Sequence, residues 1–391
     1  MTTGHGLPTG GYSADNSDPA PSFATNSELG SPWRTGIATG VGSLPGADPQ
    51  TAAAMVADEL PDLPHLAELP GRGAGADIIG RSAALLVDIA AEVVPSGWRL
   101  ARRPGRDIRR AKDFLSWDID AAEQHYAGAD WVKVQIAGPW TLAAQVETPT
   151  GNRALLDHGA VNDLAASLTE GLLAHVTEMR KRLPGTGIVV QVDEPSLPAV
   201  LAGSLPTASG FGTVSAVDPI RARDLLIDLV QALDDVPTVA HSCHPDTPLT
   251  LLREAGFGAL SVDLTAIGTR AARIDPIGEA VEAGTVLLAG VIPTTEPAGR
   301  AGSGGGAVPG RLGGAGDEER GTTTGEPATG TRRWAAPVLD LWNRLGLASA
   351  TLGGVVVTPT CGLAGASAAW AVRAMKLSRD VANLLADQSG T

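Results

Sequence analysis

A short apolar run rich in β-branched residues returns eight times along this chain, and helix-length segments separate most of these runs. The eight runs cover residues 37–41, 63–69, 131–136, 188–192, 236–239, 259–264, 285–290 and 355–358. Strands that are apolar on both faces are typical of parallel sheets covered by helices, whereas the strands of a sandwich alternate. The pattern therefore predicts an α/β fold, and within that class a (β/α)8 (TIM) barrel.

The segments between and beside the runs complete this expectation. We expect helices over residues 49–60, 77–94 and 108–126, along a stretch that ends at 182, and over 219–233. Residues 1–34 are polar and rich in Gly, Ser and Pro, so we expect a disordered tail. A low-complexity insert at 298–332, between the seventh and eighth runs, predicts a flexible loop on the active-site side. Because one such barrel takes about 250 residues or more, we expect residues 35–391 to form a single domain.

Charge and composition narrow the possible partners. The formal net charge is −14, which is unlike a nucleic-acid-binding surface with its basic patch, so we expect small-molecule substrates. The chain has no apolar run long enough for a membrane span and no apolar signal core near its start. Two cysteines in 391 residues do not form a disulfide framework. We therefore expect a cytoplasmic protein whose cysteines are free to hold a metal.

The strongest chemical signal lies at the ends of two runs. His241 and Cys243 follow the fifth run and stand two positions apart, while Cys361, the second cysteine of the chain, follows the eighth. Side chains two positions apart on a strand point to the same side, so the imidazole and the thiol reach a common point. Zinc accepts both kinds of ligand. The pattern predicts a Zn²⁺ site.

Polar residues also follow four other runs. They are Gly42 with Ser43 after the first run, Glu68 at the end of the second, Asp193 after the fourth and Asp263 in the sixth. Barrel enzymes build their active sites at the carboxyl ends of the strands, so these residues are candidates for one common site. Asp193 could instead cap the following segment. We interpret Glu194 as lying outside the site and Trp140 as core packing.

These motifs resemble a known family. His241-x-Cys243, the late Cys361, the segment Gln191-Val192-Asp193-Glu194-Pro195 and the early Gly42-Ser43 resemble the C-terminal catalytic barrel of cobalamin-independent methionine synthase. The resemblance runs from about residue 35 to residue 375, which is nearly all of the chain that we expect to be ordered. It implies a zinc-dependent methyltransferase that transfers a methyl group from 5-methyltetrahydrofolate to the thiol of homocysteine, forming methionine.

The resemblance also implies a ligand set for the metal. His241, Cys243 and Cys361 match three zinc ligands of the family, and Asp263 lies at or next to the position of the fourth, a glutamate. Zinc accepts either carboxylate. A thiol that binds zinc loses its proton, so the metal would supply the substrate as a thiolate nucleophile.

The same comparison implies residues for the amino-acid substrate. Asp193 and Glu68 match the carboxylates that hold the amino group of homocysteine, and Asp193 is our candidate catalytic residue. Ser43 and the backbone of Gly42 match the contact with the substrate carboxylate. A substrate with both charges needs acceptors and donors at separate points, which this set provides.

Three departures from the family concern the methyl donor. The chain has no room for a second, N-terminal barrel, Gln145 stands where family members carry a pterin-stacking tryptophan, and residues 291–296 contain no histidine proton donor. We therefore keep a methyl-corrinoid protein as a second possible donor. Two other functions stay open. One is a corrinoid- or other-thiol methyltransferase or decarboxylase-like enzyme of the same superfamily, and the other is a non-catalytic zinc- and thiol-binding sensor.

Overall fold

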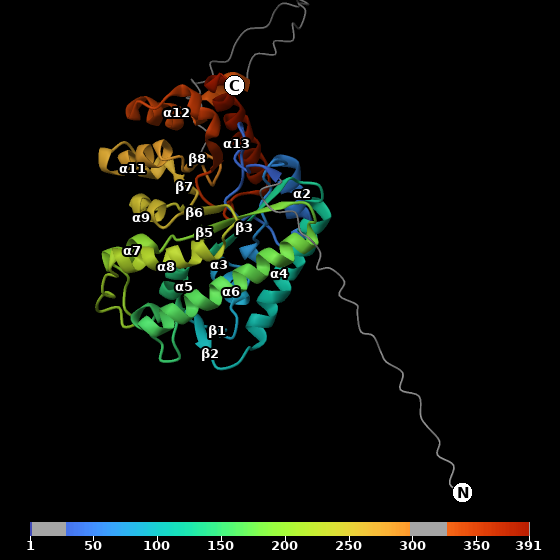
Figure 1. Cartoon of the computed structure of the whole chain (residues 1–391), viewed down its shortest axis with the longest axis vertical. Helices are drawn as coiled ribbons and strands as arrows, with labels where there is room; N and C mark the ends of the chain where they lie inside the picture. Colours follow the sequence, from blue (N-terminus) through green and yellow to red (C-terminus); the bar gives the residue numbers. More distant parts are fainter. Residues whose placement is uncertain (2–28, 298–326, 391) are drawn as a thin grey trace, which may run out of the picture.

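A curled parallel sheet of six strands forms the centre of the computed structural model, which describes residue 1 and residues 29–297 and 327–390. Its strands are β3 Trp131–Ala137, β5 Gly187–Asp193, β6 Thr238–Ser242, β7 Ala259–Asp263, β8 Val286–Ile292 and β9 Val356–Pro359. They lie side by side in chain order, and every neighbouring pair is parallel. The predicted α/β class is confirmed (Figure 1).

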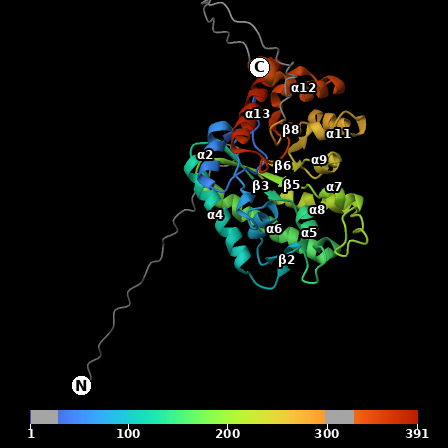
Figure 2. The ribbon, with the colours of Figure 1, turned by 180° about the vertical axis from the view of Figure 1, so that it is seen from behind.

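A layer of helices surrounds this sheet. The helices are α2 Pro49–Glu59, α3 Ile78–Leu85, α4 Arg106–His125, α5 Pro139–Gln145, α6 His158–Arg182, α7 Leu197–Ala202, α8 Pro219–Ala232, α9 Leu249–Glu254, α10 Leu264–Ile267, α11 Ala271–Glu282, α12 Pro327–Leu345 and α13 Ala368–Ser389. Contacts run from α2 through α4, α6, α8, α9, α11, α12 and α13 back to α2, so this outer layer closes on itself (Figure 2). None of the described helices is long and apolar enough to span a membrane.

The first two expected strands are not regular strands. Residues 37–43 and 63–69 pair with their neighbours only through isolated parallel bridges, which join Ala38 to Val357, Ser43 to Glu68 and His65 to Lys133. Glycines and a proline explain the difference, because Gly40 and Gly42 weaken one segment and Pro64 removes a donor from the other. The expectation of eight regular strands is therefore wrong for these two segments.

A hairpin replaces the second half of one expected helix. Helix α3 ends at Leu85, and the chain then forms β1 Ala90–Val94 and β2 Gly97–Ala101, which pair antiparallel. Together with the short β4 Val146–Glu147 they make a second, three-stranded sheet. Asp88 has a positive φ of 57°, which is incompatible with a continuing helix, and Gly97 has a φ of +134° where β2 begins after the turn. The prediction of a helix over 77–94 is wrong after residue 85.

The interior below the sheet's carboxyl end is built in layers. One apolar residue comes from each of the eight segments: Ile37, Leu63, Trp131, Val189, Val239, Ala259, Leu288 and Val356. Leu29 and Trp33, inside the segment expected to be a disordered tail, pack against this layer. Residues 2–28 and 298–326, which make up most of the expected tail and insert, lie outside the described residues, and 327–332 begin α12.

Two positions further along, seven of the eight segments carry buried polar side chains. They are Thr39, His65, Lys133, Gln191, His241, Ser261 and Thr358. Side chains two apart on a strand share one face, so this polar layer lies directly above the apolar one. Another two positions on come Asp193 and Cys243. The polar layer therefore forms the floor beneath the expected site.

Candidate functional site

A cavity of about 250 Å³ lies at the carboxyl ends of the strands. Its lining residues are Val41, Gly42, Ser43, Glu68, Pro70, Asp77, Ile78, Asp193, Pro195, His241, Cys243, Cys361 and Gly362. Every site residue expected from the sequence except Asp263 is among them. Positions that are more than 300 residues apart in the chain, from Gly42 to Cys361, thus meet at one small cavity.

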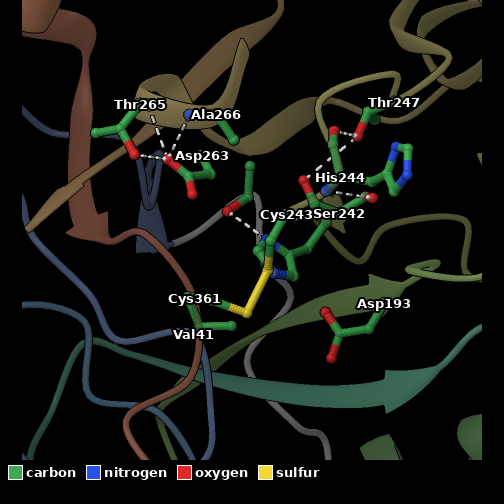
Figure 3. Close-up of a disulfide and its surroundings, with 12 residues drawn as sticks. Val41, Asp193, Ser242, Cys243, His244, Thr247, Asp263, Thr265, Ala266 and Cys361 are labelled. Carbon is green, nitrogen blue, oxygen red and sulfur yellow. Dashed lines mark hydrogen bonds between the residues drawn. A yellow bond between two sulfur atoms is a disulfide. The ribbon is translucent and has the colours of Figure 1, made fainter. Parts of the chain in front are cut away.

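One group in this cavity has the side chains of a metal site. The ligand atoms of His241, Cys243 and Cys361 all lie within 4.8 Å of one another. His241 is in β6, Cys243 follows directly, and Cys361 comes after β9. In this structure the two sulfurs form a disulfide, with the Cα atoms 6.0 Å apart (Figure 3). The expectation that both thiols are free is therefore wrong for this form, although the two cysteines do meet as expected.

A serine that the sequence did not single out orients the imidazole. The Nδ1 atom of His241 lies 2.9 Å from Ser261 Oγ, and its Nε2 atom lies 3.2 Å from Cys243 Sγ. Burial lowers the pKa of His241 to about 3, and the charge of Lys133 acts in the same direction. The ring is neutral at physiological pH, which is the form that binds metals. Ser261 stands two positions before Asp263 in β7 and carries no sequence motif of its own.

Asp263 has a different role in this structure. It is the N-cap of α10, and its Oδ1 accepts hydrogen bonds from Thr265 N at 2.8 Å, Thr265 Oγ1 at 2.6 Å and Ala266 N at 3.1 Å. Figure 3 shows it beside these two residues. It does not belong to the group formed by His241 and the two cysteines. The Oδ2 atom takes part in none of the three capping bonds.

Two carboxylates line the same cavity. Asp193 ends β5, and its Oδ1 accepts a hydrogen bond of 2.7 Å from Gln191 Nε2, while Glu68 faces the cavity from the second segment. Burial and then the charge of Glu68 raise the pKa of Asp193 well above its usual range, against the opposing effect of Lys133. Burial also raises the pKa of Glu68, against the effect of Arg81. A cation bound next to these two carboxyl groups would lower both pKa values and favour their charged forms.

Gly42 and Ser43 also line the cavity, on the segment that is bridged to Glu68. The carbonyl of Gly42 accepts from Glu68 N at 3.1 Å, and the carbonyl of Ser43 accepts from Leu363 N at 2.7 Å. A side chain at Gly362 would collide with Ser43 Oγ, so the glycine allows this close approach. The structure thus brings both residues together with the two carboxylates and the cysteines.

Lys133 is the main residue of the site region that the sequence analysis missed. Its side chain is fully buried, and its Nζ donates to Gln191 Oε1 at 2.7 Å and to Val41 O at 3.1 Å. Burial lowers the pKa of Lys133 to about 8, while the charges of Asp193 and Glu68 oppose this shift. The available signal was a lysine inside a run whose other residues, apart from Gln135, are apolar. Through Gln191 it supports Asp193 from below.

Glu194, which we interpreted as outside the site, is buried and structural. Its Oε1 accepts from Trp140 N at 3.0 Å, and its Oε2 accepts from Thr141 N at 2.7 Å and Thr141 Oγ1 at 2.6 Å. These bonds cap the start of α5. Burial raises the pKa of Glu194 to about 7, against the effect of the three hydrogen bonds.

Trp140 is fully buried, and its Nε1 donates a hydrogen bond to Ala222 O. This burial agrees with the interpretation of Trp140 as core packing.

Comparison with known proteins identifies a matching family profile and a solved structure with a similar fold. The family profile described as the catalytic domain of cobalamin-independent synthase matches residues 36–303, more than half of the chain. A B12-independent methionine synthase from Shewanella sp. W3-18-1, solved in complex with selenomethionine, has a similar fold with a TM-score of 0.52 at 11% identity. That similarity covers 90% of this chain and 98% of the Shewanella chain. No curated protein sequence matches.

Proposed function

Because the chain belongs to the family of cobalamin-independent synthase catalytic domains, and is accordingly a methyltransferase, we propose that its acceptor is the thiol of homocysteine and its product methionine. The observation that carries this proposal is the composition of one cavity of about 250 Å³. It joins a histidine and two cysteines to two buried carboxylates. The first group suits a thiol and the second suits an ammonium group, so together they match an amino acid with a thiol side chain.

The metal that suits these ligands best is Zn²⁺. A neutral imidazole and two sulfurs within 4.8 Å of one another are borderline-to-soft ligands, and the contact of Nδ1 with Ser261 leaves Nε2 facing Cys243 Sγ. His241, Cys243 and Cys361 would hold the ion once the disulfide is reduced. We keep Asp263 as the fourth proposed ligand, through the Oδ2 that is not used in capping α10. Bound zinc would lower the pKa of the substrate thiol and thereby provide a thiolate.

The remaining residues bind and orient the substrate. Asp193 and Glu68 would accept hydrogen bonds from the ammonium group, whose positive charge offsets the burial that raises both pKa values. Ser43 and the backbone at Gly42 would contact the carboxylate. The related Shewanella synthase was solved with selenomethionine, an amino acid with the same two charged groups, which supports this assignment. Holding both charges fixes the sulfur relative to the two cysteines.

The methyl donor in this proposal is 5-methyltetrahydrofolate or a methyl-corrinoid protein. The loop after β8 has no histidine, and its Pro293 carbonyl accepts from Trp370 Nε1 at 3.0 Å. At the position expected for pterin stacking, Gln145 donates to Ser196 Oγ at 3.2 Å. These departures favour testing the corrinoid donor beside the folate.

We also propose that the fold is a distorted (β/α)8 barrel. The isolated bridges connect β9 to residues 37–43, that segment to residues 63–69, and those to β3. The apolar layer takes one residue from each of the eight segments, and the helical layer closes on itself. Both features are expected of a closed barrel whose first two strands have lost regular pairing.

The test is methyl transfer by the reduced protein. Protein treated with a phosphine reductant and supplied with Zn²⁺ should form methionine from homocysteine with one of two donors, 5-methyltetrahydrofolate or methylcobalamin. Methionine would be measured by mass spectrometry, and the Cys243→Ser variant would serve as the inactive control. Binding of homocysteine without turnover of either donor would favour the sensor function instead. If the zinc-loaded protein neither binds homocysteine nor forms methionine, the proposed function is wrong.

A further inference from the structure

A buried group of charged side chains lies next to Glu68. It consists of Arg72, Arg81 and Asp118, whose side chains are 5%, 4% and 1% exposed. Arg81 comes from α3, Asp118 from α4 and Arg72 from the short 3-10 turn Pro70–Arg72. None of these three residues lines the cavity, whereas Glu68 does. The group therefore supports Glu68 from outside the cavity.

Arg81 connects this group to Glu68. Its Nη1 donates to Asp118 Oδ2, which also accepts from Arg72 Nη2 at 2.8 Å. The Nε atom of Arg81 lies 3.7 Å from Glu68 Oε1. Two arginines and two carboxylates balance in charge, which is the condition under which buried charges are tolerated. Asp118 thus holds Arg81 from one side, and Arg81 attracts Glu68 from the other.

The distance between Arg81 and Glu68 has a chemical consequence. At 3.7 Å the two groups attract each other, but the separation is too long for a hydrogen bond. Among the described residues, Glu68 Oε1 and Arg81 Nε have no hydrogen-bond partner. Arg81 therefore favours the charged carboxylate without occupying the acceptor oxygen. Glu68, which lines the cavity, thus keeps an acceptor oxygen that no described residue occupies.

We infer that Arg81 is a positioning residue, which holds Glu68 charged and oriented to accept a hydrogen bond from the ammonium group of the substrate. The inference rests on the proposed function, because it assigns the support of one of the two carboxylates that bind the amino acid. If Arg81 acts in this way, the preference of the cavity for ligands with an amino group depends on Arg81, which does not touch the substrate. A residue that serves packing alone would affect all ligands of the cavity alike.

The experiment compares two ligands that differ only in the amino group. Homocysteine and 4-sulfanylbutanoic acid are titrated into reduced, zinc-supplied protein by isothermal calorimetry. The variants are Arg81→Met, Arg81→Lys and, as a control, Arg99→Met, which removes an arginine from the distant ion pair with Glu92 at 2.6 Å. In Arg81→Met, Asp118 keeps Arg72 as a partner, so it is not left as an unpaired buried charge.

We expect Arg81→Met to weaken homocysteine binding about tenfold or more, because the variant loses one hydrogen bond between Glu68 and the charged ammonium group. Binding of 4-sulfanylbutanoic acid, which has no amino group, should be unaffected. Arg81→Lys should lose part of the preference, because a lysine lacks the planar fork whose Nη1 and Nε atoms face Asp118 and Glu68 separately. If Arg81→Met does not fold, the Arg81→Lys variant tests the inference in its place. Equal weakening of both ligands, or no weakening of either, overturns the inference. If the wild type itself ignores the amino group, the proposed substrate site fails instead.

Discussion

The hydrogen bond between Ser261 and His241 gives the sharpest test of the metal site. Ser261→Ala removes the group that lies 2.9 Å from Nδ1 and leaves the buried ring free to turn. A hydrogen bond of this kind contributes about 1 kcal/mol, and one that orients a metal ligand typically affects metal affinity by about ten- to a hundredfold. We therefore expect the affinity for Zn²⁺ to fall about tenfold or more, while the reduced protein without metal keeps its fold.

The chain offers a matched control in Ser242. This serine is also 1% exposed and lies next to His241 in β6, but its Oγ accepts from His244 N at 3.3 Å and makes no hydrogen bond with the His241 ring. Ser242→Ala should therefore leave zinc affinity unchanged. Both affinities are measured by competition with a chromophoric chelator on reduced protein. Wild-type affinity in Ser261→Ala, or an equal loss in both variants, would refute the argument that Ser261 orients the ligand.

Three further predictions concern the same region. Cys243→Ser should reduce bound zinc, measured by atomic absorption, to a small fraction of one equivalent, and a stoichiometric content would contradict the ligand assignment. Glu194→Ala leaves three buried donors without their acceptor and should lower the free energy of unfolding by about 3 kcal/mol, against about 1 kcal/mol for Asp157→Ala at the exposed cap of α6, as measured in urea. Burial raises the pKa of Glu194 from 4.5 to about 7, so the folded state binds more protons than the unfolded state between these two pH values. The contribution of Glu194 to stability is therefore lost as the pH rises through 7. Glu194→Gln should show a smaller decrease in stability over that pH range than the wild type, and identical pH profiles would contradict the assignment.

The regular part of the fold and the chemistry of the site could be read from local patterns. Apolar runs of strand length predicted all six strands of the parallel sheet, because a strand that is buried on both faces is apolar along its whole length. Five polar residues at or just after the ends of runs were expected at one edge of the sheet: His241, Cys243, Cys361, Asp193 and Glu68. The family resemblance read from these residues is confirmed over residues 36–303.

Other features depend on contacts between distant segments, which a local pattern does not encode. The joining of Cys243 to Cys361, which are 118 positions apart, follows from how the segments after β6 and β9 meet. The burial of Lys133 depends on Gln191, which is 58 residues away in the chain.

In the same way, the support of Glu68 requires α3 and α4 to bring Arg81 and Asp118 together. Sequence by itself determined which residue types stand at strand ends, since strand periodicity is local. Only the tertiary structure decided which of them share a cavity and which charges balance one another, since both depend on distance in space.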